Sequence, residues 1–257
     1  MVKFREKTTQ KLENNAGKKI SFKRFTNMSL GARISLVVFI LLVLSAVFAN
    51  VIAPYDPFAI DVARQAPDSA HWFGTDDKGR DVLSRLIYGG RYSLAIGIGS
   101  TVVALIIGAI IGAIAAVSRK WISEVIMRIM DIVMSFPGIA LAATVVIVAG
   151  ASVPTLIIAI AILYIPQVAR VVRANIMSEY GQDYVCAAIV GGAKAPHLLW
   201  KHVMRNCLAP IIVFVVVSLA DAIVFEASLS FISAGIPEPN PTWGNILADA
   251  RNGVLSG

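Results

Sequence analysis

Residues 179–210 read EYGQDYVCAAIVGGAKAPHLLWKHVMRNCLAP, a polar stretch between two strongly apolar runs. The pattern predicts two short helices joined at the glycine pair 191–192, because glycine reaches left-handed backbone angles without steric cost. The first helix is expected over 183–188. The second is expected over 196–206 and begins at Pro196, since proline suits the first turn of a helix. We interpret the stretch as an amphipathic hairpin on which a protein outside the membrane can dock.

The second predicted helix has two distinct faces. Its apolar face consists of Leu199, Trp200, Val203 and Met204, and its polar face of Lys201, His202 and Arg205.

The composition is typical of a membrane protein. Of the 257 residues, 57% are hydrophobic and only 15% are charged, whereas a soluble domain carries about 25% charged residues. Several apolar runs approach the roughly 20 residues that a helix needs to cross a bilayer. Backbone groups in lipid must be hydrogen-bonded internally, so we expect an all-α, polytopic helical membrane protein with about five transmembrane helices.

Charge is distributed unevenly along the chain. The net charge of +7 reflects the Lys and Arg that collect in cytoplasmic loops, so it does not by itself indicate nucleic-acid binding. Residues 1–33 are expected to form a basic cytoplasmic tail. The run 34–52 is too long for the core of a cleaved signal peptide, and it is predicted to be the first transmembrane helix. Residues 53–91 lack a positive excess, which predicts a periplasmic segment with a short surface helix at 81–88.

Four further spans complete the predicted topology. They are expected over residues 92–117, 123–148, 155–172 and 211–225. Gly108 and Gly112 lie one helical turn apart in the second span, and such a pair lets another helix backbone come close. Pro137 interrupts the third span, which predicts a kink at that position.

The cysteines and histidines show no metal-ligand spacing. Cys186 and Cys207 fall in or beside the polar stretch that we place in the cytoplasm, so both are predicted to be free thiols. His71, His197 and His202 are scattered along the chain, and each is expected to be a surface histidine.

Acidic residues near the spans leave two interpretations open. Asp221 and Glu226 lie in or near the outer end of the fifth span, where an acid either pairs structurally or contacts substrate. We favour structural pairing. Asp131 is expected to pair with Arg128 or with a group at an interface. The segment 76–79 lacks the alternating acids of a calcium loop and is predicted to be a turn.

Two classes of function lack their sequence signals. No GxxxxGK[ST] pattern occurs, so any ATP chemistry must belong to a partner. An intramembrane enzyme would need paired catalytic groups at one membrane depth, and we find no such pair. We therefore expect no catalytic residue, no metal site and no cofactor in this chain.

Three ordered motifs give the chain a family resemblance. Residues 179–210 resemble the cytoplasmic "EAA" loop of the permease subunits of bacterial ABC importers. The matching parts are YVCAA at 184–188, GA at 192–193, KHVMRN at 201–206 and PIIV at 210–213. The flanking segments resemble the dipeptide-permease C-type subunit. They read HWFGTDDKGRDVLSRLI at 71–87, FEASLSF at 225–231 and PTWG at 241–244.

The resemblance implies a function and a set of partners. It implies the type I ABC importer permease fold, with residues 92–257 as the permease transmembrane domain in the bacterial inner membrane and the N-terminus in the cytoplasm. The chain would form a heterodimer with a second permease subunit. Two cytoplasmic ATPase subunits would drive import, and a periplasmic solute-binding protein would deliver di- or oligopeptides. Import of nickel or glutathione stays open as an alternative.

Within the loop, the resemblance assigns ATPase coupling to one set of residues. They are Tyr184, Cys186, Ala187, Ala188, Gly192, Leu199, Trp200 and Val203. The chain departs from the family pattern at three positions. Cys186 replaces the glutamate after which the motif is named, Ile189 replaces an arginine, and Arg205 replaces a proline. Relatives carry a sixth span after PTWG. The end at Gly257 therefore predicts a C-terminal truncation, with a non-functional permease as a further alternative.

Overall fold

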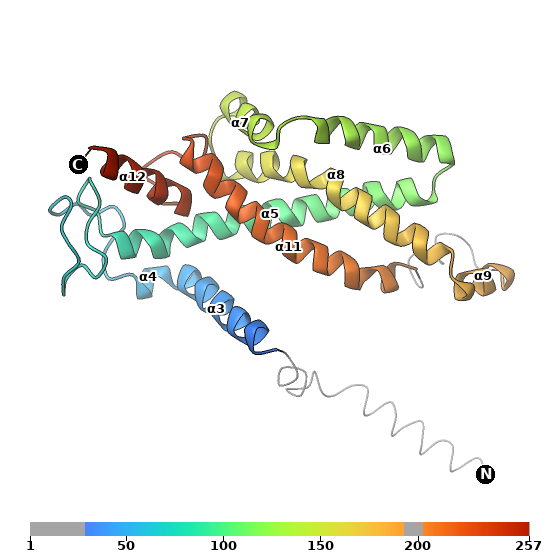
Figure 1. The fold of residues 1–257 in the computed structure, drawn as a ribbon, viewed down its shortest axis with the longest axis horizontal. Helices are drawn as coiled ribbons and strands as arrows, with labels where there is room; N and C mark the ends of the chain where they lie inside the picture. The colour runs from blue at the N-terminus through green and yellow to red at the C-terminus, as the bar shows by residue number, and fades with distance from the viewer. Residues whose placement is uncertain (1–28, 193–202, 257) are drawn as a thin grey trace, which may run out of the picture. The chain divides into compact units, whose positions relative to one another are not determined.

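The computed structural model describes residues 29–192 and 203–256, and in these ranges every regular element is a helix. The chain divides into two compact units, which meet in sequence between Leu44 and Ser45. The helices are α3 (Leu30–Val47), α4 (Ala49–Ile52), α5 (Val82–Val117), α6 (Lys120–Ser135), α7 (Gly138–Ala149), α8 (Val153–Tyr180), α9 (Asp183–Val190), α11 (Met204–Phe231) and α12 (Trp243–Ser256) (Figure 1).

Within the described ranges, four helices are long and apolar enough to cross a membrane. They are α3, α5, α8 and α11, and α6 with α7 makes a fifth span if this bent pair is counted as one. The predicted class, an all-α membrane protein with about five transmembrane helices, is therefore confirmed.

The second unit is built on the close pairing of α5 with α8, and α11 packs against both (Figure 1). Two glycines on α5 make this pairing possible. A Cβ at Gly108 would lie 2.9 Å from the carbonyl oxygen of Ile165, and one at Gly112 only 2.4 Å from that of Ala169. The predicted small-residue contact is thus confirmed, and its partner is α8.

The segment before the second span differs from the prediction. A separate surface helix at 81–88 was expected, but α5 runs without a break from Val82 to Val117. Asp81 caps its start by accepting a hydrogen bond from the Ser84 backbone N–H at 2.7 Å. Gly90 lies inside α5, and the Trp243 ring is only 3.3 Å from where a Cβ at this position would be, so the ring packs directly on the helix backbone. At about 1.5 Å per residue, the 36 residues of α5 exceed the roughly 30 Å of a hydrocarbon core.

The third span bends more sharply than a kink. Helices α6 and α7 meet at 85°, whereas a single kinked span over 123–148 was expected. The break falls at Pro137 as predicted, because proline disfavours helical geometry in the residue before it. That residue, Phe136, is extended, with φ −81° and ψ 140°.

The remaining spans extend beyond their apolar runs. Helix α8 continues eight residues past the expected end at 172, and α11 begins at Met204 instead of 211. The end of the second predicted hairpin helix, 204–206, therefore belongs to α11, and the helix continues through Pro210. Apolar composition limited the expected boundaries, whereas polar residues at a membrane surface continue a helix without cost.

Helix α12 was not expected from the sequence. It begins at Trp243, inside the PTWG motif. The Trp243 indole Nε1–H donates to the Leu86 carbonyl oxygen at 3.1 Å, which ties α12 to the start of α5. A Cβ at Gly244 would lie 2.5 Å from the Ala227 carbonyl oxygen, so α12 also lies tightly against α11. Beside this contact the fully buried Glu226 accepts a hydrogen bond from Ser230 at 2.8 Å.

Candidate functional site

Of the hairpin predicted at 179–210, residues 193–202 lie outside the described ranges. The described part, α9, follows the end of α8 and lies at the opposite end of the second unit from α12 (Figure 1). Helix α9 occupies Asp183–Val190, which confirms the first hairpin helix. The glycine pair ends it as predicted. The Gly191 N–H donates to the Ala187 carbonyl oxygen at 3.0 Å, and Gly192 has φ +84°, a conformation that favours glycine.

A buried apolar base attaches α9 to the bundle. Val185 and Val203 are fully buried, and Cys207 is 1% exposed. These three side chains join the same core cluster as Ile176 of α8 and Ile211 of α11. Val185 of α9 is therefore packed in one core with side chains of both long helices.

A set of hydrogen bonds reinforces this attachment. The Tyr184 hydroxyl donates to Glu179 Oε2 and accepts from Asn206 Nδ2 at 3.0 Å. The Asn206 amide also donates to Glu179 Oε2 at 3.3 Å. Burial and the hydrogen bond to the Glu179 carboxylate raise the pKa of Tyr184 above its usual value, so the phenol keeps its proton. The three residues thus join α8, α9 and α11.

The predicted coupling residues fall into an outer and an inner group. Tyr184, Cys186, Ala187 and Gly192 are exposed, Ala188 is partly buried, and Val203 is buried. Leu199 and Trp200 lie outside the described residues. The exposed group forms an outward edge of α9 that another protein can contact, and the buried group holds that edge in place.

Val185, Glu179 and Asn206 were not among the predicted site residues. Val185 carried no distinguishing signal, because α9 reads DYVCAAIV and most of its residues are apolar. The pairing of Glu179 with Asn206 carried none, since 27 residues separate them.

The two thiols differ in accessibility, which gives a first prediction. Both are free, as expected, but Cys186 is exposed and Cys207 is buried. Because thiol modification requires access, a maleimide is expected to modify one thiol per folded chain, and Cys186→Ala should reduce labelling to background. Mass spectrometry of the labelled protein measures this, and denaturation in SDS should expose the second thiol. Equal labelling of both cysteines in the folded protein would contradict the burial of Cys207.

A second polar site lies at the α12 end of the bundle. Arg80 Nε donates to Asp76 Oδ2 at 2.7 Å, and Arg80 Nη2 donates to Asp249 Oδ2 at 3.1 Å. Arg85 Nη2 donates to the same Asp249 oxygen at 3.4 Å, and Lys78 binds Glu238. Burial, together with the nearby charge of Glu238, raises the pKa of Asp249. This ion network joins the segment before α5 to α12.

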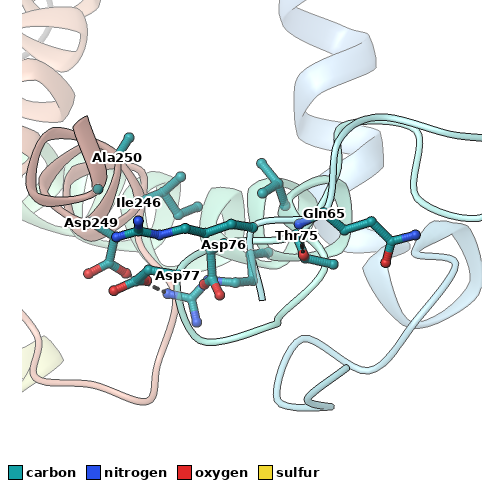
Figure 2. Close-up of a pocket in the computed structure, with 11 residues that line it drawn as sticks. Gln65, Thr75, Asp76, Asp77, Ile246, Asp249 and Ala250 are labelled. Carbon is teal, nitrogen blue, oxygen red and sulfur yellow. Dashed lines mark hydrogen bonds and ion pairs between the residues drawn. The ribbon is translucent and has the colours of Figure 1, made fainter. Parts of the chain in front are cut away.

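The network borders a pocket of about 320 Å³ (Figure 2). Asp76 and Asp77 come from the turn before α5, which confirms the predicted turn, and Asp249 faces them from α12 (Figure 2). Oxygens of the three carboxylates lie within 4.8 Å of one another, close enough to share a cation. Arg80 and Arg85 already bind oxygens of Asp76 and Asp249, so the protein itself balances this charge.

His71 is buried, which contradicts the expected surface position. It is 5% exposed, with Nδ1 2.9 Å from Asp81 Oδ1 and Nε2 3.5 Å from Asp61 Oδ2. The hydrogen bond to Asp81 raises the pKa of His71, although burial acts in the opposite direction. Burial also opposes ionisation of Asp81, but hydrogen bonds from His71 and Ser84 outweigh it and lower the pKa of that carboxyl. The two charges therefore stabilise each other.

This pair predicts a pH dependence of the segment before α5. Because the folded-state pKa of His71 is raised, its contribution is complete below the unfolded value of about 6.5 and is lost as pH rises through the raised pKa. The Asp81 contribution is lost only as pH falls through its lowered pKa. We expect amide exchange in residues 61–81, corrected for intrinsic rates, to be faster at about pH 8 than at about pH 6. His71→Gln should remove the difference, and an unchanged pH dependence in that variant would contradict the assignment.

The other acidic residues are placed as follows. Asp131 pairs with Arg170 of α8, whose Nη2 lies 2.6 Å from Asp131 Oδ1, and not with Arg128. Glu226 bonds to a hydroxyl, and no described Lys, Arg or His lies within ion-pair distance of it. Asp221 is exposed on α11.

Comparisons with known proteins show which family matches. Residues 108–255 match the family described as "Binding-protein-dependent transport system inner membrane component". Residues 28–67 match the "N-terminal TM domain of oligopeptide transport permease C".

Similar proteins include the di/tripeptide transport system permease protein DppC of Pseudomonas aeruginosa, at 39% identity over 86% of this chain and 76% of that protein. The glutathione transport system permease protein GsiD of Pectobacterium atrosepticum is 36% identical over 91% of this chain and 78% of its own length. Among solved structures, a chain of the MetNI methionine ABC transporter in an inward-facing conformation has a TM-score of 0.54. The matched region covers 66% of this chain and 88% of the solved chain. The two sequences are only 17% identical, so the likeness concerns the fold alone.

Proposed function

Because the chain belongs to the family of binding-protein-dependent transport system inner membrane components, we propose that it is the permease subunit of an ATP-driven importer of di- and oligopeptides. The family is one of transport permeases, which sets aside the intramembrane enzyme. Peptide cargo is supported by the matching di/tripeptide and dipeptide permeases, which are 39% and 37% identical to this chain. The glutathione permease at 36% identity supports glutathione, itself a tripeptide, as the second candidate cargo.

The hairpin around α9 supports ATPase coupling most directly. Its edge at Cys186 and Ala187 is exposed, while Val185 beside it is fully buried in the core. We infer that a cytoplasmic ATPase subunit binds this edge and that its nucleotide-driven movement displaces α9. The buried base and the Tyr184 hydrogen bonds then carry the displacement into α8 and α11, as a rigid element tilts when its end is moved.

Partners and orientation follow from this assignment. We place the α9 end and the basic residues 1–33 in the cytoplasm, because Lys and Arg collect on that side. Residues 53–81 and the α12 end then face the periplasm, where a solute-binding protein delivers cargo. We further propose a second permease subunit as the other half of the channel and two ATPase subunits per complex.

An exposed substitution tests the coupling proposal without disturbing the core. Ala187→Arg places a long charged side chain on the outer edge of α9. We expect it to reduce co-purification of the ATPase subunits from membranes co-expressing the whole complex by roughly tenfold or more, since loss of a central interface contact has effects of that order. Uptake of a labelled dipeptide should fall in parallel.

The matched control is Asn252→Arg, the same residue introduced at an exposed position on α12. It should leave the ATPase subunits in the complex. Wild-type recovery of the ATPases and normal uptake with Ala187→Arg would overturn the proposal. Competition of labelled dipeptide uptake by unlabelled dipeptide and by glutathione distinguishes the two candidate cargoes.

A further inference from the structure

Helix α6 presents three faces. One packs on α5 and α8 and includes Ser123, which is 5% exposed and accepts a hydrogen bond from Arg173 of α8 at 2.9 Å. The second is apolar and exposed, as expected of a surface that meets lipid. It consists of Trp121, Val125, Ile129 and Ile132.

The third face of α6 is polar and also exposed. It consists of Glu124, Arg128, Asp131 and Ser135, at intervals of four, three and four residues. Residues at these intervals form one stripe along an α-helix. A membrane helix with separate lipid-facing and polar exposed stripes has two different surroundings, so the polar stripe requires its own explanation.

Two neighbouring helices extend the stripe. Arg170 of α8 donates from Nη2 to Asp131 Oδ1 at 2.6 Å. On α11, Asp221 lies one turn before Phe225, and the Phe225 ring lies 3.5 Å from where a Cβ of Gly138 would be, at the start of α7. Asp221 is therefore on the side of α11 that faces the bend between α6 and α7. We call Glu124, Arg128, Asp131, Ser135, Arg170 and Asp221 the polar track.

The polar track reaches into the depth of the membrane. Asp221 interacts electrostatically with Tyr164, and Tyr164 lies 11 residues into α8. Eleven residues of α-helix span about 16 Å. With Val153 at the outer surface of a hydrocarbon core of roughly 30 Å, Tyr164 lies near the middle of that core. Arg170 lies about 26 Å along the same helix. A charged group at the depth of Asp221 does not face lipid and marks a water-filled cavity or a protein contact, whereas Arg170 lies near the inner surface of the core.

We propose that the polar track lines the water-filled path of the permease and holds the two charged ends of a zwitterionic short peptide. The inference rests on the proposed transport function and assigns residues to its cargo path. Charges of both signs alternate along the track, which matches a cargo with an ammonium and a carboxylate end. The Asp131–Arg170 pair is about half exposed, at 48% and 53%, so water weakens it and cargo can replace either partner.

Asp221 is the residue we assign to the peptide ammonium group. It is exposed, and no Lys, Arg or His of the described ranges lies within ion-pair distance of it. Arg128 and Arg170, nearer the α9 end, are assigned to the carboxylate. Guanidinium groups bind carboxylates with two parallel hydrogen bonds, which fixes the direction of the peptide.

Accessibility in the assembled complex tests the position of the track. In a chain carrying Cys186→Ser, single cysteines are placed at Arg128 and Ser135 on the polar stripe and at Ile129 and Ile132 on the apolar stripe of the same helix. A charged, membrane-impermeant thiosulfonate is added to inside-out vesicles that hold the whole complex. We expect the polar-stripe cysteines to react at least about tenfold faster, because the thiolate forms in water and not in lipid. An excess of dipeptide should slow their reaction.

Each other outcome overturns the proposal. Slow reaction at all four positions would mean that a partner subunit covers the stripe, and equal fast reaction at all four would place α6 flat on the membrane surface. This readout does not depend on transport, so it separates a wrong track from a wrong function. Loss of ATPase co-purification in the parent chain would instead count against the proposed function.

Cargo chemistry gives the second measurement. Asp221→Asn is expected to raise the KM for a free dipeptide by about tenfold, the effect of losing one charge-assisted contact, while the KM for its N-acetylated form changes little. Uptake by cells expressing the whole complex measures both values. An equal change for the two peptides, or no change for either, would overturn the assignment of Asp221 to the ammonium group.

Discussion

Replacing Gly112 by leucine is expected to abolish folded protein. A Cβ at this position would lie 2.4 Å from the Ala169 carbonyl oxygen and 3.0 Å from Val172 Cβ. Overpacking a core costs about 1–3 kcal/mol when side chains can adjust. Here the obstacle is the backbone of α8, so the two helices must separate, and the contact on which the second unit is built is lost. The yield of monodisperse protein in detergent measures the effect.

The same substitution at Gly31 is the matched control. No atom lies within 4 Å of a Cβ built there, so Gly31→Leu should leave the yield close to that of the wild type. Gly99→Ala provides an intermediate case, because the added Cβ would meet only the Ile157 side chain, which can rotate away. A normal yield for Gly112→Leu would show that α5 and α8 do not pack as closely as described.

Replacing Arg85 by methionine is expected to have the second-largest effect. Arg85 is 1% exposed, and its guanidinium contacts Asp249 and Asp76. Removing one partner from a buried ion pair costs about 3–5 kcal/mol at most. We expect the lower end of that range here, because Arg80 still binds both Asp76 and Asp249. Helix α12 should then detach from the segment before α5. Limited proteolysis of residues 243–256 and thermal unfolding in detergent measure this.

Lys78→Met in the same network is the control for Arg85. The Lys78 side chain is 42% exposed, and exposed ion pairs contribute only about 0–1 kcal/mol. Combining Arg85→Met with Asp249→Asn should recover part of the loss, because the double substitution also removes the carboxylate that has lost one of its two arginine partners. Additive losses in the double variant would mean that the two side chains do not interact.

The sequence predicted a structural feature correctly when the residues that specify it are close together in the chain. The break at Pro137 and the end of α9 at Gly191 and Gly192 are encoded in adjacent residues, and both were located correctly. The contact surface of α5 was visible in the spacing of Gly108 and Gly112. Its partner helix was not, because nothing in that pair specifies α8.

Errors arose where tertiary contacts overrode a local pattern. The mixed composition of 81–91 suggested a break before the second span, but Asp81 caps the helix and Trp243 packs on Gly90, so α5 is continuous. His71 was expected at the surface because a lone histidine usually is. Its burial depends on Asp81, Asp61 and Tyr55, three residues brought together only by the fold.

The amino-acid sequence by itself determined the membrane-spanning helical class, the short helix α9 with the glycine pair that ends it, and the family of the chain. These features follow from hydropathy and from motifs that are each contained in a short run of residues. Only the tertiary structure decided the polar contacts, such as Arg170 with Asp131, Tyr184 with Asn206 and Arg85 with Asp249. The physical reason is that an ion pair or hydrogen bond depends on the position of two side chains in space, and helix packing sets that position across dozens of intervening residues.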